Sequence, residues 1–152
     1  MARNHKFVWD GSKGPAQNAS VKLPELSKRY FRAGHALLRG TPSPEALHRF
    51  RLETKRFRYT LELFRPCYGP GLDRRLAMIR KIQDYLGEIS DCRSTQKLVG
   101  KKQERISRFL ERKIFRHRRQ LQKCWRSRFG KVVQQRWLTD YLARFSREPS
   151  AK

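Results

Sequence analysis

The sequence has few acidic residues and no long hydrophobic run. Its 152 residues include only 13 Asp and Glu against 37 Lys and Arg, which gives a formal net charge of +24. No stretch reaches the roughly 18 apolar residues that a membrane-spanning helix needs, so we expect no membrane insertion. The first 20 residues also lack the apolar core of a secretory signal.

Cysteine is scarce as well. The three cysteines, Cys67, Cys92 and Cys124, are odd in number and far apart. This pattern excludes a disulfide framework and is typical of reduced thiols in a cytosolic protein. Together with His117 they form no CxxC or HxxxH pair, so no metal site is predicted.

Motifs for phosphoryl chemistry are also missing. The sequence has no Walker loop, and the glycines at 69 and 71 belong to a turn-forming Gly-Pro-Gly segment. No pair of acids is placed to hold Mg²⁺ for phosphoryl transfer. We therefore expect neither a cofactor nor catalytic activity.

Positive charge is what the chain has in excess, with a pI near 11.2. Self-repulsion on this scale opposes compaction, so a polyanionic partner would stabilise the fold as well as bind to it. The candidate partners are nucleic acid, inorganic polyphosphate, an anionic membrane surface and an acidic protein.

The apolar residues recur with helical periodicity, and strand-like alternation is absent. Glycine and proline divide the pattern, with Gly87 expected to cap a helix and Gly100 expected to be a weak point inside the next one. The predicted helices are 24–39, 45–64, 72–86, 92–129 and 133–145. The prediction is an all-α fold: an antiparallel four-helix bundle with a long basic fourth helix and an extra short C-terminal helix.

This pattern predicts one helical domain over residues 21–146. Residues 1–20 are rich in Gly, Asn and Ser and are expected to form a flexible arm, and 147–152 to form a disordered tail.

The segment 45–64 has two opposed helical faces. Its apolar face carries Leu47, Phe50, Thr54, Phe57, Leu61 and Phe64, and its cationic face carries His48, Arg51, Lys55 and Arg58, with Tyr59 beside them. Arg56 projects about 80° from His48. A solvated face normally mixes charge signs, yet Glu62 is the only acid near this row. We interpret the cationic face as an anion-binding surface.

A second basic row follows the predicted fourth helix, opposite its apolar stripe. It consists of Lys101, Arg105, Arg108, Arg112, Arg116, Arg119, Lys123 and Arg126. A solvated surface would also explain such a row. However, most of its members are arginines, whose planar fork suits bidentate phosphate recognition. We therefore favour anion binding here too.

The segment 45–64 resembles the signature of the CHAD family, the conserved histidine α-helical domain. The matching residues are L-H-R-F-R-L-E-T-K-R-F-R-Y at 47–59 and L-E-L-F at 61–64. A second block at 82–91 resembles the family's Q-x-x-L-G-x-x-x-D turn, and 121–129, centred on Trp125, resembles its W-x-x-F helix. Together the blocks cover residues 24–130.

The resemblance implies a helical module that binds inorganic polyphosphate through basic residues lining a groove. The expected lining residues are His48, Arg51, Lys55, Arg56, Arg58, Tyr59, Arg105, Arg108, Arg112, Arg116 and Arg119. In that family the domain has two similar bundles, whereas this chain is long enough for one. Either a homodimer rebuilds the groove, which we favour, or half a groove suffices.

Two alternatives remain. A nucleic-acid-binding protein could use the same arginines, although most Phe and Trp residues lie on apolar stripes, which argues against a stacking platform for single strands. An enzyme acting on phosphoanhydrides could use His48 as nucleophile or acid. We predict a non-catalytic polyphosphate binder that is cytoplasmic and associated with polyphosphate granules.

Overall fold

A computed structural model describes residues 8–100 and 103–150 of the chain. Within these ranges it is all-helical and has no strand, which confirms the predicted fold class. The six helices are α1 (Pro15–Leu38), α2 (Pro44–Leu63), α3 (Arg65–Tyr68), α4 (Pro70–Val99), α5 (Glu104–Phe129) and α6 (Val132–Arg144). None of the helices in this part of the chain is both long and apolar enough to cross a membrane.

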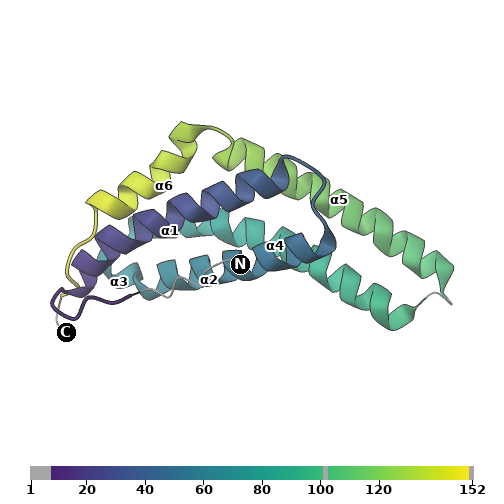
Figure 1. The fold of residues 1–152 in the computed structure, drawn as a ribbon, viewed down its shortest axis with the longest axis horizontal. Coiled ribbons are helices and arrows are strands. Elements are labelled where there is room, and N and C mark those ends of the chain that lie inside the picture. The colour runs from purple at the N-terminus through teal and green to yellow at the C-terminus, as the bar shows by residue number, and fades with distance from the viewer. Residues whose placement is uncertain (1–7, 101–102, 151–152) are drawn as a thin grey trace.

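The longer helices pack in a simple order. α4 lies between α2 and α5, and α1 lies between α2 and α6. α1 and α6 run side by side, while the hairpin of α4 and α5 extends past the loop that joins α1 to α2 (Figure 1). The N-terminal part of α2 therefore lies against the C-terminal half of α4, where the candidate site forms.

An aromatic core joins α1, α2 and α5. Tyr30 of α1 stacks on Phe50 and Phe57 of α2, with ring centroids 5.3 and 4.6 Å apart, and meets the edge of Trp125 of α5 at 5.7 Å. The Tyr30 hydroxyl also shares a hydrogen bond of 3.2 Å with the buried Thr54 hydroxyl. The predicted apolar face of α2 is thus buried, which turns its cationic face outward.

The N-terminal part of the structure differs from the predicted flexible arm. α1 begins at Pro15 instead of residue 24, so residues 15–20 are helical and Ala16 and Ala19 are buried. The side-chain amide of Asn18 donates to the carbonyls of Asp10, Lys13 and Gly14, which fastens the preceding loop to the helix. Polar residues in a segment that was expected to be flexible therefore hold the first turn of α1 in place. Residues 1–7 lie outside the described part of the chain.

The boundary between the predicted third and fourth helices is wrong. α4 continues through Gly87 to Val99, and the chain turns at Gly100, whose φ of 66° ends the helix. A backbone position with positive φ favours glycine. The helix therefore ends at Gly100, and Gly87 is an ordinary position inside it. The predicted helix 92–129 is therefore the end of α4, a turn and α5.

The three cysteines, Cys67, Cys92 and Cys124, are free thiols. Burial raises the pKa of the Cys67 and Cys124 thiols. This environment is typical of inert structural cysteines.

Candidate anion-binding groove

The cationic face of α2 is held in place by a well-formed helix start. The Ser43 hydroxyl accepts a hydrogen bond of 3.1 Å from the Ala46 amide, and Pro44 occupies the first helical position. Such a cap fixes where the helix begins, and the buried apolar face fixes its rotation. His48 and Lys55 are consequently exposed, and Arg51 is half-buried.

Arg58, at the far end of this row, is tied to protein groups. Its Nε donates to Gln83 Oε1 of α4 at 2.8 Å, and its Nη1 donates to Glu62 Oε1 at 2.7 Å. Glu62 also pairs with Arg80 of α4 at 2.9 Å, and the Arg58 guanidinium lies 4.2 Å from the Tyr59 ring centroid. Arg58 therefore holds α2 against α4, and only part of its fork remains open to a phosphate.

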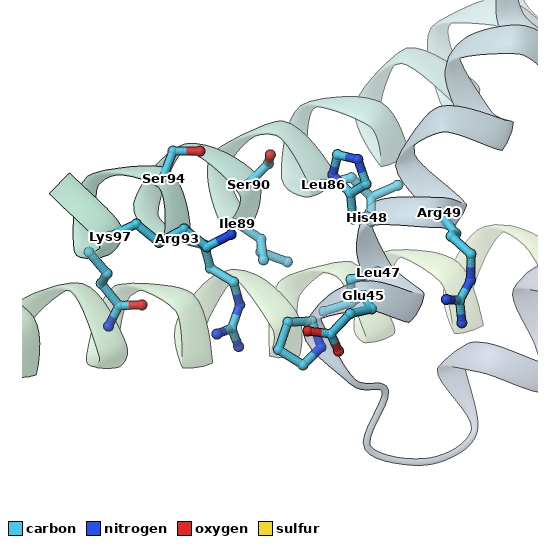
Figure 2. A pocket seen from close by; sticks show the side chains of 12 residues that line it. Glu45, Leu47, His48, Arg49, Leu86, Ile89, Ser90, Arg93, Ser94 and Lys97 are labelled. Carbon is cyan, nitrogen blue, oxygen red and sulfur yellow. The ribbon is translucent and has the colours of Figure 1, made fainter.

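A pocket opens between the N-terminal half of α2 and the C-terminal half of α4, with a volume of about 630 Å³. Figure 2 shows that α2 supplies one wall and α4 the other. Leu47, Leu86 and Ile89 supply apolar lining, and five titratable or cationic side chains line the pocket together with two serines. The polar lining residues are Glu45, His48, Arg49, Ser90, Arg93, Ser94, Gln96 and Lys97.

Arg93 is the most constrained of these cations. Its Nε is buried and has no hydrogen-bond partner among the described residues. On α5, burial lowers the pKa of the Arg118 guanidinium, and repulsion by Arg93 lowers it further. A buried donor without a partner is costly, so an anion in the pocket would relieve both the missing hydrogen bond and the repulsion.

Glu45 is the single carboxylate lining the pocket. Hydrogen bonds from its own backbone amide and from the Ser43 side chain lower its pKa, and the charges of Arg93 and Arg49 lower it further. One exposed carboxylate neutralises only part of the positive charge around it. The pocket therefore stays electropositive at neutral pH.

Gly87 lies between the pocket and the contact of Arg58 with Gln83. It shares one face of α4 with Gln83 and Ser90, at spacings of four and three residues. A Cβ at position 87 would meet nothing within 4 Å. Open space therefore lies beside α4 at this position, and we call the surface from the pocket past Gly87 to Arg58 the groove between α2 and α4.

The second basic row lies elsewhere. Arg105, Arg108, Arg112, Arg116 and Arg119 are all exposed on α5, on the side opposite its buried residues, which include Ile114 and Leu121. α5 packs mainly against α4 through its buried side, so these arginines point away from α4 and from its pocket with α2. The two rows do not line one groove, contrary to the sequence-based expectation. Lys101 lies outside the described residues.

Several pocket residues were missed by the sequence analysis. Arg49, Ser90, Arg93, Ser94 and Lys97 were not expected at a site. Once α4 is continuous, 90, 93, 94 and 97 form one helical face by their spacing. The mistaken helix end at Gly87 hid that periodicity.

A protein-family model described as the CHAD domain matches residues 4–100, a range that contains α1 to α4. The chain belongs to the CHAD domain family. CHAD domains in general bind polyphosphate-related ligands. The match contains both walls of the groove and ends at the turn after α4, so the block at 121–129 lies outside it. Neither the curated proteins nor the solved structures gave a match to this chain.

Proposed function

We propose that this CHAD domain binds inorganic polyphosphate, or a similar linear polyanion, in the groove between α2 and α4. The pocket at one end of this groove carries the proposal. There, side chains of His48, Arg49, Arg93 and Lys97 line the pocket from two helices, with a single carboxylate among them. A buried guanidinium nitrogen without a partner adds a donor that an anion would satisfy.

The groove suits a chain of phosphates more than a single one. From His48 to Arg58 the row on α2 extends about 15 Å at the rise of an α-helix. A linear polyanion entering at Arg93 and Lys97 would pass Arg51 and Lys55 and reach the cluster of Arg58 and Arg80. Multiple contacts release multiple counterions, so we expect binding that is length-dependent and weakened by salt.

Arg56 and Tyr59 have supporting roles in this proposal. The Tyr59 ring lies 5.6 Å from Lys55 Nζ and 4.2 Å from Arg58 Cζ, so its face helps to hold both cations in the row. Tyr59 is 48% exposed, and we expect its hydroxyl to contact a phosphate oxygen. The exposed Arg56 lies beside the row and would contact an anion at its edge.

We infer that binding proceeds without turnover. Glu45 is the only acid in the pocket lining, whereas Mg²⁺-assisted phosphoryl transfer generally uses several oxygen ligands. The test is release of orthophosphate from long-chain polyphosphate with Mg²⁺ present. Release that is abolished by His48→Ala would overturn this inference and assign His48 a catalytic role.

The homodimer stays a prediction. Two copies would face the same basic groove across a twofold axis, which is tolerable only with an anion between them. Sedimentation equilibrium with and without polyphosphate measures this directly. A monomer under both conditions would show that a single groove suffices.

A competition titration at near-physiological salt tests the proposed ligand. Labelled long-chain polyphosphate is displaced by unlabelled polyphosphate, single-stranded RNA or duplex DNA at equal phosphate concentration. We expect polyphosphate to compete at least about tenfold better, a difference of about 1.4 kcal/mol, and Arg51→Ala/Lys55→Ala to lose that preference. Equal competition by nucleic acid, unchanged in the variant, would contradict the proposal and favour a general nucleic-acid binder.

A further inference from the structure

The outward face of α5 combines positive charge with exposed aromatic rings. All the described members of its basic row are exposed, and among these described members Arg108 alone forms an ion pair, with Glu104 of the same helix. Phe109 and Phe115 are 58% and 63% exposed. On a helical projection each lies within about 60° of Arg112, on opposite sides of the row.

Most Phe and Trp residues were expected on apolar stripes, which argued against a stacking platform for single strands. Phe109 and Phe115 are two exceptions, since both rings are exposed beside the arginines. The Arg119 guanidinium lies 5.8 Å from the Phe115 ring centroid, so a planar group stacked on Phe115 would also meet a cation. α5 runs along an outer edge of the molecule, where this face is accessible (Figure 1).

We propose that the outward face of α5 is a second binding site, separate from the groove, for single-stranded nucleic acid. Its arginines suit a phosphate backbone, and its exposed rings suit unpaired bases, the combination that single-strand binders use. Polyphosphate has no bases and gains nothing from the rings. The row from Arg105 to Arg126 spans about 32 Å, enough for several nucleotides.

Other polyanions fit this face less well. A duplex keeps its bases stacked and would leave Phe109 and Phe115 unused. An amphipathic helix binds a membrane by burying its apolar side, but that side of α5, including Leu110 and Leu121, is already buried in the protein.

The experiment compares a labelled 20-nucleotide oligo(U) with an abasic oligonucleotide of the same length. Wild type should bind oligo(U) more tightly, and Phe109→Leu/Phe115→Leu should weaken oligo(U) binding about tenfold while leaving the abasic strand unchanged. Phe145→Leu, at an exposed phenylalanine directly after α6, is the matched control and should change neither. Equal binding of both strands by wild type, or no loss in the double variant, would overturn the proposal.

A charge variant separates this site from the groove. Arg112→Gln/Arg116→Gln/Arg119→Gln should lower the slope of log K against log salt for oligo(U) by about 2, because three phosphate contacts are lost. Arg51→Ala/Lys55→Ala should leave oligo(U) binding unchanged, and Phe109→Leu/Phe115→Leu should leave polyphosphate binding unchanged. If the α2 variant weakens oligo(U) as much as the α5 variant, the strand binds in the groove and the second site does not exist.

Discussion

At the scale of single residues, Gly87 and Gly34 show what a side chain would meet at two helical positions. Both lie inside helices, α4 and α1 respectively, where glycine is unfavourable. A Cβ at Gly34 would come within 2.1 Å of the Trp125 ring, so close packing requires this glycine. A Cβ at Gly87 would enter open space beside the groove. Close packing therefore explains the glycine at position 34. It does not explain the glycine at position 87, which lies beside the groove.

Gly87→Ala should stabilise the fold. The substitution removes the helix penalty of glycine, about 1 kcal/mol, without a clash. For a chain of this size the melting temperature should rise by about 2–4 °C. Gly34→Ala is the contrasting variant and should lower it, because the new methyl group would displace Trp125. A fall in melting temperature for both variants would contradict the open groove at position 87.

Glu45→Gln should strengthen polyphosphate binding. The carboxylate competes with an incoming anion for Arg93 and Arg49, so its removal should raise affinity about two- to fivefold at low salt. Glu25→Gln on α1, also exposed, makes the same change in net charge away from the pocket and is the control. An equal gain in both variants would mean that only total charge matters.

The pH dependence of Glu45 follows from the direction of its pKa shift. Its pKa in the folded state lies below the ordinary value of 4.5, because hydrogen bonds favour the charged form. Its contribution to stability is therefore present above that ordinary value and is lost as pH falls through the lowered pKa. Polyphosphate affinity should rise in wild type over the same acid range, and Glu45→Gln should remove that part of the rise.

At the scale of helices, the sequence predicted much of the fold but misplaced two boundaries. The apolar face of α2 follows from periodicity, and the structure has it. The ends near Gly87 and Pro24 were wrong, since glycine and proline are compatible with a helix interior when tertiary packing supports it. The pocket could not be predicted from the sequence, because its lining depends on which residues of α2 lie opposite which residues of α4.

Gly100→Ala should destabilise the hairpin of α4 and α5. Its backbone, at φ 66° and ψ −176°, lies in a region that only glycine adopts readily, so the substitution should cost about 1–3 kcal/mol. Gly40→Ala is the control, because position 40 has no positive φ and a Cβ there would meet nothing within 4 Å. Urea unfolding measures both. Equal stability of the two variants would contradict the assigned turn.

At the scale of the whole molecule, the dominant feature is a net charge of +24 on a chain of 152 residues. Two of its cationic surfaces are the groove of α2 and α4 and the outward face of α5. Ion pairs with the few acids, such as those of Glu62, fix helices in place and leave most cations unneutralised. The fold thus keeps its charge available to ligands at some cost in stability.

This charge predicts an unusual response to salt. Without ligand, the melting temperature should rise between 50 and 500 mM NaCl, because screening reduces self-repulsion. Polyphosphate at low salt should raise it further than NaCl of equal ionic strength, because it binds the folded state. A melting temperature that falls or stays level with salt would show that self-repulsion does not limit stability.

The central claim, that polyphosphate binds in the groove of α2 and α4, is tested most directly by two charge-matched double variants. Arg93→Gln/Lys97→Gln alters the pocket, and Arg136→Gln/Arg144→Gln removes the same charge from exposed positions on α6. Binding of labelled long-chain polyphosphate should weaken about tenfold in the pocket variant, a loss of about 1.4 kcal/mol, and less than about twofold in the α6 variant. Equal losses would show that binding follows total charge and that the groove is not the site.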